Sequence, residues 1–424
     1  MRVLILGGGG REHALAWRLS RDADVTEVLC APGNPGIAAL GACLPADLSK
    51  PGDLVDLARR ERADLTVVGP EAPLERGVAN RFRDAGLAVL GPGSRGAALE
   101  CSKAWSKQFM ARHRIPTARF EDCQSLDQAL DVVRRGPFGL PVVIKADGLA
   151  AGKGVTVAET REEAEAAVRD AMEHRRFGDA GARLVIEECL VGPEVSFFVL
   201  VDGERALPLG TAQDHKRIFD DDKGPNTGGM GAFAPSPLVS PAFSFDIMRT
   251  VVEPVVAGMR AEGEPYRGFL YVSLMLTADG PKVIEFNVRF GDPEAQVVLP
   301  QLEGRFAAAL HGAATGQLED GLLSLSEDRF VGVVLAAPGY PGSPTTGQVI
   351  DGLDRVAALD DVLVFHAGTQ ATADGIVAAG GRVLTVVGRG ESFETAISRA
   401  YQAVGLVRFD GMQYRRDIGR KALS

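Results

Sequence analysis

Several features that would place a protein in a special class are scarce or missing in this sequence. No apolar run approaches the ~20 residues needed to cross a membrane. The five cysteines form no Cys-x-x-Cys pair, which argues against a zinc site or a disulfide framework and favours reduced thiols. The 46 basic residues are outnumbered by 56 acidic ones, and the net charge of −10 argues against a nucleic-acid partner.

Internal repeats and low-complexity tracts are also missing. A strand predicted to begin at Arg2 leaves no room for a signal peptide, so we expect a soluble, cytoplasmic protein without membrane partners. The hydrophobic content of 46% and the charged content of 24% are those of an ordinary globular protein. A length of 424 residues predicts two to four domains with sizeable cores.

The segment IEFNVRFGDPE, which starts at Ile284, alternates apolar and polar side chains. It follows the apolar run 268–276 across a short turn, a pattern typical of a β-hairpin. Side chains two positions apart share one face of a strand, so Glu285, Asn287 and Arg289 are expected to point the same way. The apolar residues between them are expected to face a core.

The polar face of this strand suits a metal and a phosphoryl group. Carboxylate and amide oxygens from Glu285 and Asn287 are ligands that Mg²⁺ prefers. A guanidinium beside the metal, from Arg289, could hold a transferring phosphoryl group. The alternative is an amphipathic edge strand whose polar face is simply solvated.

The N-terminal strand 2–6 is followed by four glycines, 7–10, and then by a helical pattern that runs to Leu19. A strand, a glycine loop and a helix present amides to an anion. The third glycine of a dinucleotide fingerprint is replaced in either register, and no acidic residue ends the next strand, so nicotinamide binding is disfavoured. A single phosphate on the loop is the better interpretation. His13 is either a ligand or an ordinary residue of the first helical turn.

Glu71 follows the strand 66–68, where an open α/β sheet places its ligands. Its carboxylate could bind sugar hydroxyls. Alternatively, it is a helix N-terminal carboxylate favoured by the helix dipole.

Three lysines in the middle of the chain point to a polyphosphate. Lys103 lies in the first turn of a helix predicted over 102–112, where the dipole disfavours a cation unless a ligand is present. Lys145 ends a strand, and Lys153 lies in the glycine-rich loop 148–154 that follows. No helix begins after these glycines, so this is not a Walker loop. The alternative is a flexible surface hairpin.

The segment Glu187–Leu190 leaves a predicted strand and could offer backbone groups to an adenine edge, with Glu194 accepting the ribose hydroxyls. The polar, glycine-rich stretch from Asp214 to Phe233 shows little periodicity and is predicted to be a long substrate loop. Asp214, Lys216 and Arg217 are its candidate working residues. Strands at 330–335 and 382–387 and a helix at 393–404 are predicted near the C-terminus.

Together, these motifs resemble the phosphoribosylamine–glycine ligase family of the ATP-grasp superfamily. The resemblance spans nearly the whole chain, and its motifs stand in the family's order: GGREHA at Gly9, GPEAPL at Gly69, KADGLAAGKG at Lys145, DHKR at Asp214, GPNTGGMGAF at Gly224 and EFNVRFGDPE at Glu285.

The resemblance implies a multidomain α/β and α+β protein with an ATP-grasp fold. A Rossmann-like pre-ATP-grasp domain would cover residues 1–102, the ATP-grasp domain 103–325 with a mobile lid at about 120–192, and a small C-terminal domain 326–424. ATP would lie between two antiparallel sheets.

The resemblance also implies a reaction and its residues. ATP would drive the joining of 5-phosphoribosylamine and glycine, giving ADP and phosphate in purine biosynthesis. Catalytic roles would fall to Arg289, Lys145 and Asp214, and Mg²⁺ or Mn²⁺ would bind Glu285 and Asn287. ATP would contact Lys103, Lys145, Lys153, Glu187, Leu190 and Glu194. The other substrates would contact Gly9, Gly10, Arg11, Glu71, Asp214, Lys216, Arg289, Asp292 and Glu294.

One departure concerns the metal. Many members of the wider superfamily carry an acidic residue on the strand before the metal strand, but the run 268–276 has none. The alternatives are another ATP-grasp enzyme, such as a biotin-dependent carboxylase component, and a nucleotide-binding regulator without turnover. We expect a monomer that acts on small molecules.

Overall fold

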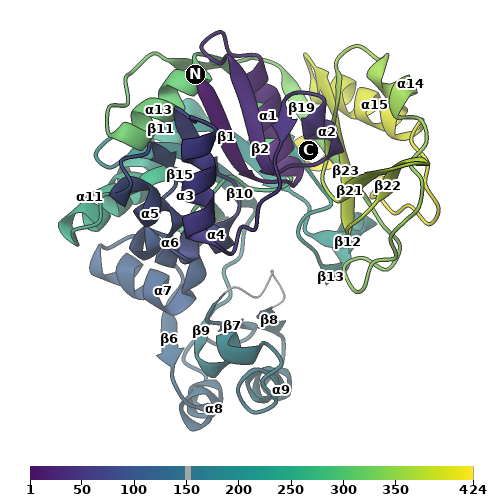
Figure 1. Cartoon of the computed structure of the whole chain (residues 1–424). Helices are drawn as coiled ribbons and strands as arrows, with labels where there is room; N and C mark the ends of the chain where they lie inside the picture. The colour runs from purple at the N-terminus through teal and green to yellow at the C-terminus, as the bar shows by residue number, and fades with distance from the viewer. Residues whose placement is uncertain (149–153, 424) are drawn as a thin grey trace.

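The computed structural model describes residues 1–148 and 154–423. Figure 1 shows an N-terminal α/β part, a central part, a yellow C-terminal part and a separate lower lobe that carries β6–β9 with α8 and α9. No helix in the described ranges has both the length and the apolar character needed to span a membrane.

The N-terminal part is a parallel sheet of order β3-β2-β1-β4-β5 with helices between its strands. Its central strands β1 and β4 and the short β5 are almost wholly buried, as expected of a parallel sheet covered on both faces, whereas β3 at the edge is more exposed. The elements are β1 (Arg2–Gly7), α1 (Gly10–Ser20), β2 (Glu27–Pro32), α2 (Pro35–Ala38), β3 (Ala42–Cys43), α3 (Pro51–Arg60), β4 (Leu65–Val68), α4 (Glu71–Glu75), α5 (Val78–Asp84), β5 (Val89–Leu90) and α6 (Ser94–Cys101).

The helix α7 (Lys103–Arg112) leads from this part to the lower lobe, which we call the lid. An antiparallel sheet of order β6-β9-β7-β8 packs its apolar face against two helices. Side chains of Ser125 and Thr160 cap these helices, which fixes where each begins. The elements are β6 (Phe120–Cys123), α8 (Leu126–Arg135), β7 (Val142–Ala146), β8 (Val155–Ala158), α9 (Arg161–Met172), the 3₁₀ turn η1 (Gly178–Ala182) and β9 (Leu184–Glu188).

The central part is built on the predicted hairpin of β15 and β16, which pairs with β10 and β11. Its elements are β10 (Glu194–Asp202), β11 (Ala206–Asp214), β12 (Arg217–Phe219), η2 (Asp220–Asp222), β13 (Lys223–Asn226), β14 (Gly231–Ala234), α10 (Pro241–Ile247), the π-helical turn η3 (Met248–Val252), α11 (Glu253–Ala261), β15 (Arg267–Thr277), β16 (Gly280–Asn287), α12 (Ala295–Val298), η4 (Leu299–Gln301), β17 (Leu302–Gly304), α13 (Phe306–Thr315) and β18 (Leu323–Leu325).

The C-terminal part continues the central sheet. Strands of the central and C-terminal parts together form an eight-stranded sheet of order β16-β15-β10-β11-β14-β19-β23-β20. Within it, β14 pairs with β19 from Gly231↔Val333 to Ala234↔Phe330. The elements are β19 (Arg329–Ala336), α14 (Leu353–Ala357), β20 (Val362–His366), β21 (Thr369–Thr372), β22 (Gly375–Ala378), β23 (Arg382–Gly390), α15 (Phe393–Val404) and η5 (Arg420–Leu423). The predicted C-terminal strands and helix are therefore found, but they share a sheet with the central part.

The interpretation of 214–233 as an irregular loop is wrong. Asp214 ends β11, and β12 and β13 then form a small hairpin, which we call the substrate hairpin (217–226). Asp221 and Asp222 take left-handed backbone angles at its tip, a conformation that aspartate tolerates better than most residues. Three aspartates, Asp220–Asp222, thus make a tight hairpin turn, which hydrophobic periodicity does not reveal.

The substrate hairpin is held by the end of the chain. Arg415 is 1% exposed and forms ion pairs with Asp417 at 2.6 Å and with Asp222 at 2.8 Å. Its guanidinium also donates to the carbonyl of Arg217. In the reverse direction, the amide of Asp221 donates to Asp417. The C-terminal segment therefore sets the position of the hairpin next to Asp214.

Replacing Arg415 by methionine should destabilise the protein, because it leaves Asp417 without its cation. Loss of one partner of a buried ion pair costs about 3 kcal/mol in the free energy of unfolding. Denaturant titration measures this value. Arg416→Met, at an exposed neighbouring side chain, is the control and should change stability by less than about 0.5 kcal/mol. Equal stability of the two variants would contradict the role given to Arg415.

Candidate functional site

The predicted metal strand is β16, and a β-bulge lies within it. Val283 pairs with Leu274 and Glu285 pairs with Ser273, so Ile284 is the extra residue. Glu285 is partly exposed and Asn287 is 8% exposed. These two oxygen donors lie on the strand as predicted, and they suit a hard cation.

Arg289 lies just beyond β16 and is surrounded by acceptors. Its Nη2 donates to Glu100 at 3.0 Å and to the Oδ1 of Asn287 at 3.1 Å, and its Nε lies 3.4 Å from Glu71. Burial alone would lower the pKa of Arg289, but Glu100 and Glu71 outweigh it and raise the pKa. The carboxylate of Glu100 also accepts the amide of Val288 at 2.7 Å. Glu71 and Glu100, both from the N-terminal part, therefore orient the guanidinium beside Asn287, one of the predicted metal ligands.

Lys145 and Glu187 meet in the lid, where both are 4% exposed. The ammonium of Lys145 pairs with one oxygen of Glu187, and Lys107 pairs with the other at 2.5 Å. Burial favours the neutral form of Glu187, yet Lys145 and then Lys107 hold the pKa of this carboxyl below its usual value. The side chain of Glu187 is thus occupied by two lysines, and only the backbone of its segment suits the predicted adenine contact.

The remaining predicted ATP residues are placed unequally. Lys103 begins α7, and its Nζ donates to the carbonyl of Gly148 at 3.1 Å, at the start of the glycine-rich loop. Leu190 follows β9 and is partly exposed. Lys153 lies outside the described residues.

Glu194 and Asp214 flank Lys216. The ammonium of Lys216 donates to Glu194, which begins β10, while Asp214 ends the neighbouring β11. Burial raises the pKa of Asp214 to about 7, and Glu294 and Glu194 add to this effect while Lys216 opposes it. The Asp214 carboxyl therefore changes charge near neutral pH. Arg217 is exposed and instead donates to Gly224 within the substrate hairpin.

Glu294 lies at the end of the segment 285–294, which carries the predicted metal ligands. Its Oε1 accepts the Tyr271 hydroxyl at 2.9 Å, and the same hydroxyl lies 2.8 Å from the Ser196 hydroxyl. Glu294 is 4% exposed, so its polar atoms need such hydrogen-bond partners inside the protein.

The glycine loop faces the other end of this motif. The Gly9 amide donates to Glu12 at 2.6 Å and the Arg11 amide to Asp292 at 3.4 Å. A Cβ on Gly10 would lie 2.4 Å from the Nε2 of Gln296, which explains the glycine there. Two amides of the glycine loop thus donate to carboxylates. This arrangement offers no support for a phosphate on the loop, and phosphate binding there stays a prediction.

His13 has a structural partner. Its Nδ1 accepts the backbone amide of His366 at 2.8 Å, and burial, with His366, lowers the pKa of His13 to about 3. Of the two interpretations given for His13, this geometry favours the residue of the first helical turn.

Several of the predicted residues act on one another electrostatically. Glu285 favours the charged form of Lys216, and Glu294 acts both on Asp214 and on Arg289. Such effects fall off with distance, which is consistent with these side chains lying near one another. Side chains from the N-terminal part, the lid and the central sheet therefore converge.

Three residues that hold this site together were missed in the sequence. Glu100 supports Arg289, Lys107 pairs with Glu187, and Arg382 forms an ion pair with Asp292 at 3.3 Å and donates to the Gly228 carbonyl. Each lies in a helix or strand far from its partner along the chain. For Glu100 and Lys107 the only available signal was a charged residue on the packed side of a helix, and Arg382, at the start of a strand, gave none.

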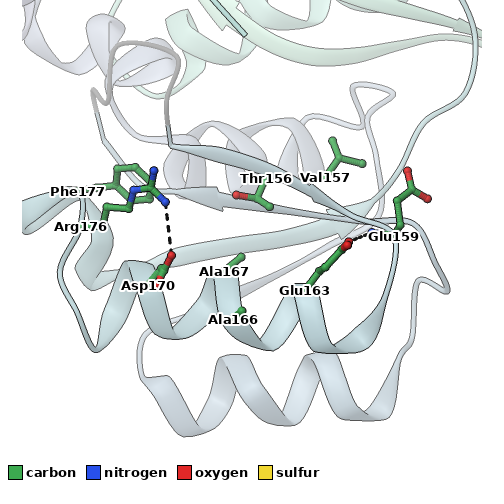
Figure 2. A pocket seen from close by; sticks show the side chains of 9 residues that line it. All are labelled: Thr156, Val157, Glu159, Glu163, Ala166, Ala167, Asp170, Arg176 and Phe177. Carbon is green, nitrogen blue, oxygen red and sulfur yellow. Dashed lines mark hydrogen bonds and ion pairs between the residues drawn. The ribbon is translucent and has the colours of Figure 1, made fainter. Parts of the chain in front are cut away.

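A separate hollow of about 510 Å³ lies on the lid between β8 and α9 (Figure 2). Its lining residues are Thr156, Val157, Glu159, Glu163, Ala166, Ala167, Asp170, Arg176 and Phe177. None of these belongs to the site described above.

Family models match the chain in three consecutive pieces. They describe the N domain, the ATP-grasp (A) domain and the C domain of phosphoribosylglycinamide synthetase, over residues 1–100, 101–295 and 330–421. The chain belongs to the phosphoribosylglycinamide synthetase family. The family and the ligase activity predicted from the sequence are thereby confirmed, and an ATP-grasp domain fits ATP as the cofactor.

Related proteins align with this chain over nearly their whole length. The phosphoribosylamine–glycine ligase of Xanthomonas axonopodis pv. citri is 51% identical and is aligned over 100% of this chain and 98% of its own. The enzyme of that name from Pseudomonas aeruginosa is 49% identical, with 100% and 99% covered.

Solved structures confirm the predicted fold. The phosphoribosylamine–glycine ligase of Thermotoga maritima has a TM-score of 0.84 at 34% identity and covers 98% of this chain and 100% of its own. The biotin carboxylase domain of the Hydrogenobacter thermophilus 2-oxoglutarate carboxylase, solved with MgADP and bicarbonate, has a TM-score of 0.74 at 18% identity, with 97% and 91% covered. At that identity the likeness concerns the ATP-grasp fold alone.

Replacing Glu100 by glutamine should slow the ligase reaction about tenfold, because a hydrogen bond to a charged group contributes roughly 1.5–3 kcal/mol. Arg289 would keep its other acceptors but lose its closest carboxylate. Steady-state ADP release measures the effect. Glu75→Gln, at an exposed position of α4, should leave the rate unchanged. A Glu100→Gln rate within twofold of the native rate would show that Arg289 does not depend on this carboxylate.

Proposed function

We propose that the chain joins 5-phosphoribosylamine to glycine through a glycyl phosphate, with ATP converted to ADP and phosphate, as a step of purine biosynthesis. The main support is that, in a member of this family, Lys145 reaches the Ile284 carbonyl next to Glu285 and Arg289 donates to Asn287 on the same strand. A carboxylate resists attack by an amine because oxide is a very poor leaving group. Phosphorylation replaces it with phosphate. Such phosphoryl transfer depends on positioning and charge neutralisation, which this set of cations suits.

ATP is proposed to lie between the lid and the central sheet. Lys103, Lys145 and Lys153 would contact its phosphates, and the backbone of 187–190 would contact adenine. Glu194 would accept the ribose hydroxyls, for which it must share or release Lys216.

Glu285 and Asn287 would hold Mg²⁺ or Mn²⁺. The amide oxygen of Asn287 already accepts Arg289 at 3.1 Å and retains a second lone pair, so the donor set fits a hard cation. The bound metal would supply charge neutralisation at the phosphates.

Glycine is proposed to bind among Asp214, Lys216, Arg289 and Glu294. Its ammonium would face the carboxylates and its carboxylate the cations. Phosphoribosylamine would lie next to it, along Gly9, Gly10, Arg11, Glu71 and Asp292, where the glycine loop meets the metal motif.

The remaining assignments follow from charge and family. We propose that the protein is a cytoplasmic monomer. We also propose that it has no nucleic-acid partner, since its net charge of −10 repels a polyanion.

The affinity for glycine should fall as the pH falls through 7. Asp214 loses its negative charge below its pKa of about 7, so the KM for glycine should rise about tenfold between pH 8 and pH 6. Initial rates at saturating ATP measure this profile. Asp214→Asn should raise the KM and make it nearly constant over the same range. An unchanged slope in that variant would assign the titration to another group.

Glycine labelled with heavy oxygen in its carboxylate tests the glycyl phosphate directly. The oxygen that attacks the γ-phosphorus leaves with phosphate when the amine attacks the acyl carbon. Label should therefore appear in inorganic phosphate, with ADP as the nucleotide product, as mass spectrometry can show. An adenylating mechanism would instead place label in AMP and release pyrophosphate. Phosphate free of label would overturn the proposed intermediate.

A further inference from the structure

One buried carboxylate faces two ammonium groups where the lid meets the rest of the protein. Glu187 of β9 pairs with Lys145 of β7 on one oxygen and with Lys107 of α7 on the other. All three residues are at most 4% exposed. A single ion pair would neutralise the carboxylate, so Glu187 itself needs only one of the two lysines, although Glu285 also favours the charged form of Lys107. A second buried cation on the same carboxylate is costly and calls for an explanation.

The two lysines are not equally held. Lys107 also donates to the Thr117 hydroxyl at 2.7 Å, and that hydroxyl donates to the Val283 carbonyl at 2.7 Å. Lys107 is therefore fixed between Glu187 and a second, well-formed hydrogen bond. Its helix α7 precedes the lid, so Lys107 does not belong to the sheet that carries Lys145.

Lys145 has a weaker second contact. Its Nζ lies 3.4 Å from the carbonyl of Ile284, at the long limit for a hydrogen bond. Ile284 is the bulged residue of β16, directly before Glu285. The Lys145 ammonium thus lies at the edge of the proposed phosphate and metal site, and only Glu187 holds it firmly.

The difference between the second contacts of Lys107 and Lys145 affects how easily the Lys145 ammonium could leave Glu187 to bind a phosphate. If Lys145 were the only partner of Glu187, its transfer to a phosphate would leave a buried carboxylate unpaired, at a cost of several kcal/mol. With Lys107 in place, Glu187 keeps a cation throughout. Burial, only partly offset by Glu187, lowers the pKa of Lys107 to about 8, so this lysine is still mainly charged at neutral pH.

We propose that Lys107 is a positioning residue, a permanent counterion of Glu187 that leaves Lys145 available to the phosphates of ATP. The inference rests on the proposed function, in which Lys145 contacts ATP. It adds that ATP affinity depends on a lysine that does not touch the nucleotide.

The test is the dissociation constant of MgATP, measured by calorimetry on the full chain without the other substrates. In Lys107→Met, Lys145 becomes the only cation for Glu187, and ATP should bind about tenfold or more weakly, a loss of at least 1.4 kcal/mol. The double variant Lys107→Met/Glu187→Gln removes the charge that retains Lys145 and should recover most of the lost affinity. Arg112→Met, an exposed cation on the same helix, should bind ATP as the native protein does.

The outcomes separate the inference from the proposed function. Native ATP affinity in Lys145→Met would overturn the phosphate contact itself, and with it the inference. Weak binding in Lys145→Met together with native affinity in Lys107→Met would overturn only the inference. So would a Lys107→Met defect that the second substitution leaves in place, since a purely structural defect is not reversed by removing Glu187's charge.

If Lys107→Met does not fold, Glu187→Gln still tests the role of Lys107. Glu187→Gln alone keeps both lysines and releases Lys145 from its carboxylate, so MgATP should bind at least as tightly as in the native protein. Weaker binding in this variant would overturn the counterion role of Lys107.

Discussion

The site depends on one partly buried guanidinium. Arg289 extends from the end of the metal strand and is held between Glu71 of α4 and Glu100 of α6, both from the N-terminal part. Two carboxylates on one cation leave little rotational freedom, and the amide of Val288 is bound to Glu100 as well. The predicted metal residues are thereby placed beside the N-terminal part, and the central hairpin cannot shift without breaking these ionic contacts.

A different kind of contact joins the lid to this rigid base. Its own core is separate from the cores of the other parts, and a bridge between Thr117 and Val283 meets the metal strand near the bulge at Ile284. The bulge releases a carbonyl from the ladder at the place where Lys145 arrives. The bulge at Ile284 thus both interrupts the strand that carries Glu285 and Asn287 and provides the carbonyl that Lys145 of the lid contacts.

Local pattern was enough to predict the elements that carry the chemistry. The hairpin of β15 and β16 followed from alternation, and the helix at 393–404 has the predicted bounds because Ser392 caps it. The partners of the site residues could not be predicted, since Glu100 and Arg289 are 189 positions apart and neither local pattern refers to the other. The substrate hairpin was missed because aspartates, rather than glycine or asparagine alone, make its turn.

The pairing of β14 with β19 has a consequence for how this chain can be divided. The family models end one piece at 295 and begin the next at 330, but the backbone ladder crosses that boundary without a break. A protein cut there would present an unpaired, apolar edge at Gly231–Ala234, the kind of edge that recruits other chains into aggregates. Recombination of this protein with others must therefore carry the C-terminal strands together with the central ones, whatever boundary the sequence suggests.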